Sequence, residues 1–406
     1  MKETRFKQTE IGLIPEDWKV VSISKIAETS SGGTPSRSIK RYYNGTIRWI
    51  TTSELKDSRI YDSIEHITEE AVQNSSAKMF PKGTILMAMY GATIGKLGIL
   101  EVCSTTNQAC CAIICHDIKN IYLFYYLFFI RKDIILQGCG AGQPNISQNI
   151  VKNINIRLPE KIEQNKIASA LTSIDNLLLS LDKLIDKKRL IKQGAMQELL
   201  TGKKRLPGFT GEWKASHLGE LCIIKDGTHQ TPRYVENGIP FFSVENVTNN
   251  NFKRVKYITS EDHNILTKNY RIEKGDVLMT RIGSIGICKY IDWDVNASFY
   301  VSLALLKFKE PSLAKFFSFY SMTERFIKDI ESNSLQFASP KKINLSNISS
   351  VRIEYPTSKD EMEAITIILS SIEKELESLE SKKAKYEHIK QGMMQQLLTG
   401  KIRLIS

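Results

Sequence analysis

The residues of this chain that most resemble catalytic motifs fall short of them. The stretch GATIGK (91–96) resembles a phosphate-binding loop, but it has three residues between its glycines where a Walker motif has four, and Leu97 replaces the serine or threonine that should follow the lysine. Glu54 and Lys56 form the Glu-x-Lys triplet of some nucleases, without an evident acidic partner. An amino-methyltransferase needs an Asn/Asp-Pro-Pro-aromatic motif, and no Pro-Pro pair occurs in the chain. We therefore predict that the chain is not catalytic alone.

Five residues of metal-binding types crowd one stretch. They are Cys103, Cys110, Cys111, Cys115 and His116. The surrounding sequence ACCAIICH is typical of an apolar buried strand, in which neighbouring residues point to opposite faces, and it lacks the CxxC spacing of a metal site. None of the six histidines lies in an HxxxH or HxE arrangement. A metal site stays open as the alternative, but we predict structural thiols, with neither metal nor cofactor.

Length and charge indicate a basic protein of two domains. A chain of 406 residues is too long for one ordinary domain. Its 56 basic and 44 acidic residues give a formal net charge of +12, which suits a polyanionic partner, although a merely basic, solvated surface is the alternative. The start MKETRFKQTE lacks an apolar signal segment, and the apolar run Ile121–Ile130 is too short to cross a bilayer. We expect a cytoplasmic protein with reduced thiols, no membrane contact and a buried helix at Ile121–Ile130.

An internal repeat organises the chain. IKQGAMQELLTGK (191–203) returns as IKQGMMQQLLTGK (389–401), EDWK (16–19) returns as GEWK (211–214), and GTILMAMYGATIG returns as GDVLMTRIGSIG. Each copy begins with a mixed block of β-rich patches, turn signals and helix-like segments, so the predicted fold class is α+β. The predicted boundaries are 1–158 and 204–356 for the two blocks, and 159–203 and 357–401 for the tails that follow them. The copies keep their framework but differ between landmarks, which favours two domains of one architecture with different targets.

Each tail has the spacing of a long helix with a coiled-coil seam. Alternating steps of four and three residues lead from Ile167 to Leu199 and from Ile365 to Leu397, and eight of the ten positions in each series are apolar. Two such helices, separated by a block that returns the chain, are predicted to form an antiparallel coiled coil about 60 Å long. The alternative is that each helix packs only in the core of its own domain.

The order of these motifs, found twice, resembles the Type I restriction-modification specificity subunits. The resemblance rests on GLIPEDWKVVSISKIA, GGTPS, IRWITTSEL, YGATIGKLGI, IEQNKIASALTSID and KQGAMQELLTGKKRLPGF, and again on GFTGEWKASHLGEL, DGTHQTP, IGSIG and IKQGMMQQLLTGKIRL. One departure is Glu361-Met362, where the first copy has Glu163-Gln164. The resemblance implies that each block is a target-recognition domain that reads one half of a bipartite, asymmetric site in double-stranded DNA. It implies that the helices set the spacing and dock two modification subunits, which are adenine methyltransferases, and that ATP-driven restriction subunits are further partners.

Polar and basic residues beside the turns are suited to base edges and phosphates, since Arg and Lys donate to guanine and Asn and Gln pair with adenine. In the first block we select Thr34, Ser36, Arg37, Arg41, Tyr42, Tyr43, Thr51, Thr52, Ser53, Tyr90, Thr93, Gln143 and Asn145. In the second block we select His229, Gln230, Arg233, Tyr234, Ser243, Glu245, Asn246, Arg281, Ser284, Gln336, Lys341 and Lys342. Arg281 is the leading candidate, because the first copy has the apolar Met89 at its place. For each single residue, a solvated surface position is the alternative.

The helix ends are the predicted docking surface for partner subunits. The residues selected there are Lys192, Gly194, Met196, Leu199, Lys390, Gly392, Met394 and Leu397. Gly194 and Gly392 lie inside the helices at equal registers, where glycine costs about 1 kcal/mol relative to alanine. The shared cost predicts a close backbone approach, either between the two helices or to a partner.

Two other functions compete with DNA specificity. A stand-alone restriction or methylation enzyme is disfavoured by the missing motifs. A coiled-coil scaffold whose basic blocks hold RNA or another protein is the second alternative.

Overall fold

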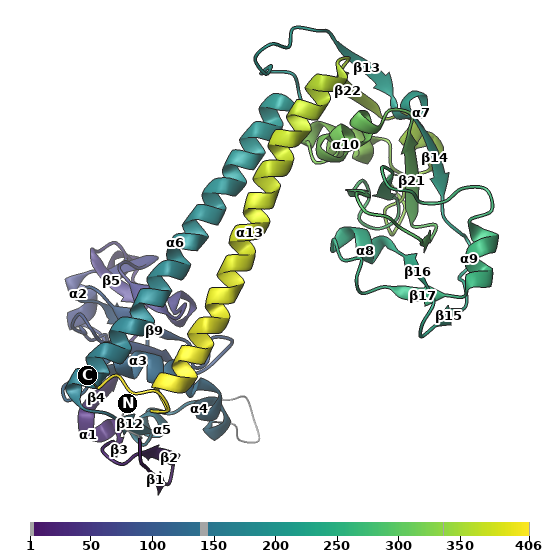
Figure 1. The fold of residues 1–406 in the computed structure, drawn as a ribbon. Helices are drawn as coiled ribbons and strands as arrows, with labels where there is room; N and C mark the ends of the chain where they lie inside the picture. Colours follow the sequence, from purple (N-terminus) through teal and green to yellow (C-terminus); the bar gives the residue numbers. More distant parts are fainter. Residues whose placement is uncertain (1–3, 139–144, 336, 406) are drawn as a thin grey trace. The chain divides into compact units, whose positions relative to one another are not determined.

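The computed structural model describes residues 4–138, 145–335 and 337–405, which divide into two compact units (Figure 1). Unit 1 consists of Met1–Asp182 and Lys382–Ser406, and unit 2 of Lys183–Ser381. Each unit contains one of the repeated blocks together with a part of each long helix, α6 (Lys161–Leu199) and α13 (Lys359–Leu397).

Unit 1 is built on a five-stranded sheet in the order β4-β11-β8-β9-β6 and a three-stranded sheet in the order β10-β5-β7. Two further antiparallel pairs, β1-β2 and β12-β3, lie at the start and end of the block. Its elements are β1 (Phe6–Thr9), β2 (Gly12–Pro15), β3 (Lys19–Ser22), α1 (Ile23–Ile26), β4 (Ala27–Ser31), η1 (Lys40–Tyr43), β5 (Ile47–Ile50), η2 (Thr52–Glu54), β6 (Ser58–Ile60), β7 (Glu65–Ile67), α2 (Glu69–Gln73), β8 (Ile85–Ala88), β9 (Leu97–Leu100), β10 (Thr105–Thr106), β11 (Cys110–Cys115), α3 (Asn120–Phe129), α4 (Arg131–Gln137), α5 (Gln148–Lys152) and β12 (Asn155–Leu158).

Unit 2 repeats this plan. Its main sheet has the order β14-β21-β18-β19, and its second sheet the order β15-β17-β16-β20, with β16 and β20 parallel as β5 and β10 are in unit 1. Its elements are β13 (Trp213–His217), α7 (Leu218–Leu221), β14 (Cys222–Asp226), β15 (Tyr234–Val235), β16 (Ile239–Phe242), α8 (Val244–Thr248), β17 (Lys256–Ile258), α9 (Ser260–Leu266), β18 (Val277–Thr280), β19 (Cys288–Tyr290), β20 (Ser298–Phe299), β21 (Leu303–Phe308), α10 (Pro311–Tyr320), α11 (Glu324–Ser332), α12 (Leu345–Ser350) and β22 (Arg352–Pro356). The predicted fold class, two repeated mixed domains alternating with two long helices, is confirmed.

The core of unit 1 joins the sheet, α3 and the long helices. Tyr122–Leu127 of α3 are buried, which confirms the buried helix expected at Ile121–Ile130. The same hydrophobic cluster includes Leu171 of α6 and Met394 of α13. No helix in the described part of the chain is long and apolar enough to cross a membrane.

Three thiols of the cysteine-rich stretch, those of Cys110, Cys111 and Cys115, lie in β11, whereas Cys103 is exposed in the segment before β10. Cys110 and Cys111 are buried in the sheet, and burial raises the pKa of the Cys111 and Cys115 thiols to about 12. Such thiols stay protonated at neutral pH, whereas a metal binds the thiolate. Within the ranges that the structure describes, no group of three or more His, Cys, Asp or Glu residues could hold a metal ion.

The two long helices, each of 39 residues, run antiparallel along each other in both units (Figure 1). In unit 2, Lys188 and Lys192 of α6 pair with Glu375 and Glu373 of α13, so the residue numbers of the partners run in opposite directions. In unit 1, Lys383 and Lys390 pair in the same way with Asp182 and Asp175. Every position of the two predicted heptad series is buried or half-buried, as a coiled-coil seam requires.

The lysines that interrupt the seam form one ion pair twice. Lys192 Nζ lies 2.8 Å from Glu373 Oε1, and Lys390 Nζ lies 2.7 Å from Asp175 Oδ1. Lys390 follows Lys192 by 198 positions, and Glu373 follows Asp175 by the same 198 positions. A polar residue at one seam position specifies the register of a coiled coil, so these pairs fix how the two helices align.

A buried ion pair closes each unit where a long helix ends. In unit 1, Arg403 contacts both carboxylate oxygens of Glu163, with Nε at 2.9 Å from Oε1 and Nη2 at 2.8 Å from Oε2. The indole Nε1 of Trp18 donates to the same carboxylate at 3.0 Å, and Glu163 is only 2 % exposed. In unit 2, Arg205 makes the equivalent pair with Glu361, which is 1 % exposed.

The repeated phrase LTGK brings these arginines into place. Gly400 has a φ of +72°, and a Cβ atom there would lie 2.4 Å from Cγ of Pro15, so only glycine fits. Gly202 has a φ of +68° and packs in the same way against the ring of Trp213. The repeated phrase and the EDWK and GEWK motifs are therefore two sides of one contact, made once in each unit.

We predict that Arg403→Met destabilises unit 1 by about 3 kcal/mol, because the substitution leaves the buried Glu163 carboxylate without a cation. Native-state hydrogen exchange of the peptides that cover β3 and the start of α6 measures this change. Lys401→Met, an exposed position two residues earlier, is the matched control. Equal exchange in the two variants would contradict the prediction.

Candidate nucleic-acid interface

The topology of the main sheet brings the candidate loops of each unit to one edge. Strand β11 runs antiparallel to both β4 and β8, so the ends of β4 and β8 meet the start of β11 at the same edge. In unit 2 the ends of β14 and β18 meet the start of β21 in the same way. The predicted residues near Thr34 and Tyr90 in unit 1, and near His229 and Ser284 in unit 2, follow these strand ends.

In unit 1, three loops meet around Gln108. Thr34 Oγ1 donates a hydrogen bond to Gln108 Oε1, and Tyr90 Oη donates to the Gln108 carbonyl oxygen at 3.2 Å. The backbone of Tyr90 forms a β-bridge with Asn145. Tyr90, Gln108 and Asn145 are exposed, whereas Thr93 in the following turn is half-buried. Three predicted residues, Thr34, Tyr90 and Asn145, thus lie around Gln108. Gln108 itself was not predicted, because no local sequence pattern marks it.

The arginines of the first loop are engaged by acidic and aromatic neighbours. Arg37 donates to both oxygens of Glu65 at 2.6 and 2.7 Å, and its guanidinium lies 4.2 Å from the ring centroid of Tyr43. The hydrogen bond from Arg37 lowers the pKa of Glu65, in spite of the opposing effect of burial. Arg41 makes a similar pair with Glu70. Both arginines are therefore held in ion pairs, so a contact with a phosphate or a base would require them to exchange an existing partner.

Other predicted residues of unit 1 have structural partners. Tyr42 is buried, and Tyr43 Oη donates to the carbonyl oxygen of Pro35 at 2.7 Å. Thr51 begins a capping box with Glu54, so the glutamate of the Glu-x-Lys triplet caps a turn. Ser53 and Thr51 share a hydrogen bond of 2.8 Å between their hydroxyls. Exposed or half-buried positions remain at Ser36 and Thr52, and Gln143 lies outside the described residues.

In unit 2, Asp226 joins two of the predicted residues. His229 Nε2 lies 2.8 Å from Asp226 Oδ2, and Arg281 Nη1 lies 3.2 Å from the same oxygen. Burial alone would raise the pKa of Asp226, but the His229 hydrogen bond and the Arg281 charge bring it below its usual value. His229 is exposed.

The structure changes the interpretation of Arg281, the leading candidate. The residue is 5 % exposed, and its Nε donates to the carbonyl oxygen of Ile343 at 3.3 Å. The amide of Arg281 donates to the carbonyl oxygen of Ser302, as the amide of Met89 donates to that of Ala109. This confirms that Arg281 and Met89 occupy corresponding positions. Arg281 lies beneath the surface and holds Asp226 and the segment at Ile343, so it is not exposed for contact with a base.

The remaining predicted residues of unit 2 divide by exposure. Asn246 is buried in a capping box with Ser243, and it donates to two backbone carbonyl oxygens. Tyr234 is exposed, and Lys256 Nζ lies 4.6 Å from its ring centroid. Further residues that are exposed or half-buried are Gln230, Arg233, Glu245, Ser284, Lys341 and Lys342. Lys341 pairs with Glu331 at 3.4 Å, and Gln336 lies outside the described residues.

Apart from the two glycines, the predicted partner-binding residues fall into three groups. Leu199, Leu397 and Met394 are buried in the block cores, so they hold the helix ends in their units and do not face outward. Lys192 and Lys390 are taken up by the seam ion pairs. Met196 is half-buried and lines a groove.

Gly194 and Gly392 do not mark a close approach between the two helices. A Cβ atom built at either position meets no heavy atom of the chain within 4 Å. The predicted approach between the two helices is therefore wrong, and an approach by a partner stays a prediction.

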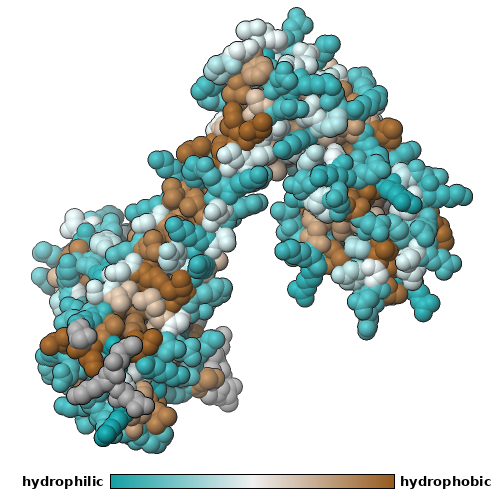
Figure 2. Space-filling view, viewed as in Figure 1, coloured by the Kyte–Doolittle hydropathy of each residue, from teal (hydrophilic) through white to brown (hydrophobic). Residues whose placement is uncertain are grey.

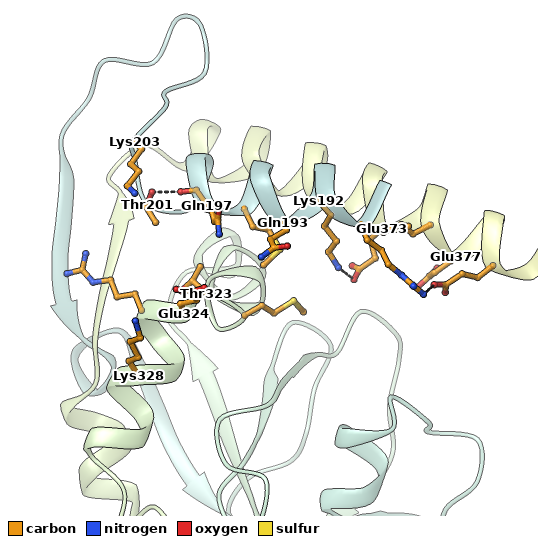
Figure 3. A pocket seen from close by; sticks show the side chains of 16 residues that line it. Lys192, Gln193, Gln197, Thr201, Lys203, Thr323, Glu324, Lys328, Glu373 and Glu377 are labelled. Atoms are coloured by element: carbon orange, nitrogen blue, oxygen red, sulfur yellow. Dashed lines mark hydrogen bonds and ion pairs between the residues drawn. The ribbon is translucent and has the colours of Figure 1, made fainter. Parts of the chain in front are cut away.

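A groove of about 1180 Å³ lies in unit 2 beside the predicted partner-binding residues (Figure 3). Lys192, Gln193 and Gln197 of α6 line one side, and Thr323 and Glu324 at the start of α11 line the other.

The long helices also expose apolar side chains, visible as brown patches along them in Figure 2. Those exposed on α6 include Leu179, Leu184, Leu190 and Ile191. Exposed apolar patches of this kind are typical of protein contact sites.

Comparison with known proteins gives a consistent result for both copies of the repeat. A family model described as Type I restriction modification DNA specificity domain matches residues 15–191 and again 210–388. The Type I restriction enzyme MjaIX specificity subunit of Methanocaldococcus jannaschii is 34 % identical over 273 residues, which are 60 % of this chain and 61 % of that protein. The MjaVIII specificity subunit of the same organism is 27 % identical over 429 residues, 99 % of this chain and 97 % of that protein. Among solved structures, the S subunit of a Type-I restriction-modification system from M. genitalium has the same fold, with a TM-score of 0.64 and 16 % identity over 97 % of this chain and 98 % of that one.

The Asp226–Arg281 pair can be tested against its counterpart in unit 1, where the strand register places Ser31 and Met89. We predict that Arg281→Met destabilises unit 2 by about 1–3 kcal/mol, because Asp226 loses a charged hydrogen-bond partner. The double variant Asp226→Ser, Arg281→Met should recover most of this loss, since unit 1 is built with that pair. Denaturant unfolding followed by hydrogen exchange in β14 and β18 is the measurement, and a double variant as unstable as the single one would disprove the pairing.

Proposed function

The chain belongs to the family of Type I restriction modification DNA specificity domains, and we propose that it acts as the specificity subunit that directs such a system to one bipartite, asymmetric DNA site. It is a non-catalytic subunit, in a system whose chemistry is carried out by other subunits. In this proposal each unit reads one half of the site. Double-stranded DNA is the ligand, and the place of action is the cytoplasm.

One observation carries the proposal. The two units share the order of four strands in the main sheet and of three in the second sheet, and they share their buried ion pairs, but matching loop positions carry different side chains. Strand register and backbone bonds pair Thr34 with His229, Tyr90 with Ile282, and Gln108 with Val301. A framework that is kept while its exposed loops change is suited to reading two different sequences with one architecture.

The long helices would set the distance between the two half-sites. Each has 39 residues, so at 1.5 Å per residue it is about 58 Å long. One turn of DNA spans about 34–36 Å. Recognition units joined by helices of this length suit half-sites about one turn apart rather than adjacent bases.

Two modification subunits, as adenine methyltransferases, would dock on the helix pair, and restriction subunits would join the complex from there. The exposed leucines of α6, the groove beside Met196 and the open space at Gly194 and Gly392 support this placement. The alternative function, a scaffold whose heads hold RNA or protein, predicts no sequence preference on DNA.

Base-resolution mapping of N6-methyladenine tests the function. Co-expression of this chain with its modification subunit in a host without such methylation is expected to give one split, asymmetric motif. Replacement of residues 204–356 by the matching block of another specificity subunit should change one half of the motif and keep the other. A motif that is absent, or that changes in both halves, would contradict the division of the site between two units.

The glycines inside the helices give a second test. We predict that Gly194→Ala and Gly392→Ala each stabilise the isolated chain by about 1 kcal/mol, because alanine favours the helix and its methyl group meets no atom of the chain. The same substitutions should weaken binding of the modification subunit, because they add a methyl group where the partner's backbone approaches. Thermal unfolding and a binding titration measure the two effects, with the exposed Lys187→Ala on the same helix as the control. Unchanged affinity would remove the glycines from the docking surface.

A further inference from the structure

We call the edge of the main sheet where β4 and β8 end and β11 begins the reading edge of unit 1. Gln108 occupies a fixed place at this reading edge, although it does not belong to any regular element. Its chain neighbours are bonded on both sides: the Asn107 amide donates to the Ile50 carbonyl oxygen at 3.0 Å, and the Met89 amide donates to the Ala109 carbonyl oxygen at 2.9 Å. Tyr90 Oη holds the Gln108 carbonyl oxygen itself. The backbone is therefore set, and only the exposed side chain is left to contact a ligand.

The GGTPS motif explains how Thr34 reaches this side chain. A Cβ atom at Gly32 would lie 2.1 Å from the Thr106 carbonyl oxygen, so the chain can lie this close to β10 only because residue 32 is glycine. The Gly33 amide donates to the same carbonyl oxygen at 2.8 Å, and the buried indole of Trp49 donates to the Gly33 carbonyl oxygen at 2.9 Å. These contacts place Thr34 beside Gln108.

The hydrogen bond from Thr34 orients the amide group of Gln108. A side-chain amide has two N–H donors and an oxygen with two lone pairs. Thr34 Oγ1 occupies one lone pair of Gln108 Oε1, which leaves one acceptor site and both donors. An amide that can accept and donate at once pairs with the N6 and N7 atoms of adenine in the major groove.

Comparison with unit 2 separates this role from a structural one. The backbone bond from Met89 to Ala109 has its counterpart between Arg281 and Ser302, at 2.9 Å in each case. Nevertheless, the positions that match Gln108 and Tyr90 carry Val301 and Ile282. The same backbone framework forms without the amide and the phenol, so the framework does not require them.

We propose that Gln108 is a specificity-determining residue of unit 1, which reads one adenine in its half-site, and that Thr34 is the positioning residue that orients it. The inference rests on the proposed function and adds a base and a residue to it. It gives the reading edge of unit 1 a neutral amide where unit 2 has the apolar Val301.

The test is the methylation motif produced by the chain together with its modification subunit. Gln108→Leu should relax one position of one half-site by about 5- to 150-fold, the range for loss of a bidentate base contact, and leave the other half unchanged. Gln108→Glu should change the preference at that position from adenine to cytosine, since a carboxylate accepts from the cytosine amino group. Thr34→Val should relax the same position to a smaller degree.

The control is Gln8→Leu, an exposed glutamine on β1, which should keep the whole motif. An unchanged motif in Gln108→Leu would overturn the assignment. Loss of methylation at every site in Gln108→Leu, with Thr34→Val unaffected, would show a structural role and overturn it as well. A wild-type complex that methylates no split motif would instead disprove the proposed function, and the inference with it.

Discussion

Each unit depends on one buried ion pair between an arginine that follows a long helix and a glutamate near the start of the other long helix. A carboxylate as buried as Glu163 or Glu361 is stable only with a cation and further hydrogen bonds around it. Arg403 and Arg205 meet that need, and the tryptophan of the EDWK or GEWK motif packs beside each pair. The pair therefore holds the two helix ends and the adjoining block together.

The repeat is kept where the chain is buried and is lost where the loops are exposed. The seam pair Lys192–Glu373 recurs as Lys390–Asp175, and the closing pair recurs with the same 198-residue offset. By contrast, the edge loops of the two units share backbone bonds but few side chains. An interior that the two units share, with loops that differ between them, allows each unit to read its own target on the same scaffold, since loops carry recognition on a rigid scaffold.

Much of the fold follows from sequence, because the repeat, the heptad seam and the apolar run of α3 are local patterns. The candidate site follows less well, because its decisive contacts join residues distant in the chain. Arg281 resembles a free cation until the fold places Asp226, 55 positions earlier, beside it. Leu199 and Met394 have the spacing of a helix face, but the block core covers them. Gln108 gains its role only from Thr34, 74 positions away.

The division of the chain also determines the order in which the units can be completed during synthesis. Unit 2 is one continuous segment, whereas unit 1 is split into Met1–Asp182 and Lys382–Ser406. Domains generally fold as they are made, from the N-terminus onward. Here the first block must wait for Arg403, which the ribosome adds after the whole of unit 2, so the block made first is the one finished last. A chain truncated just before residue 382 would thus contain the whole of unit 2, but unit 1 would lack the ion pair between Arg403 and Glu163.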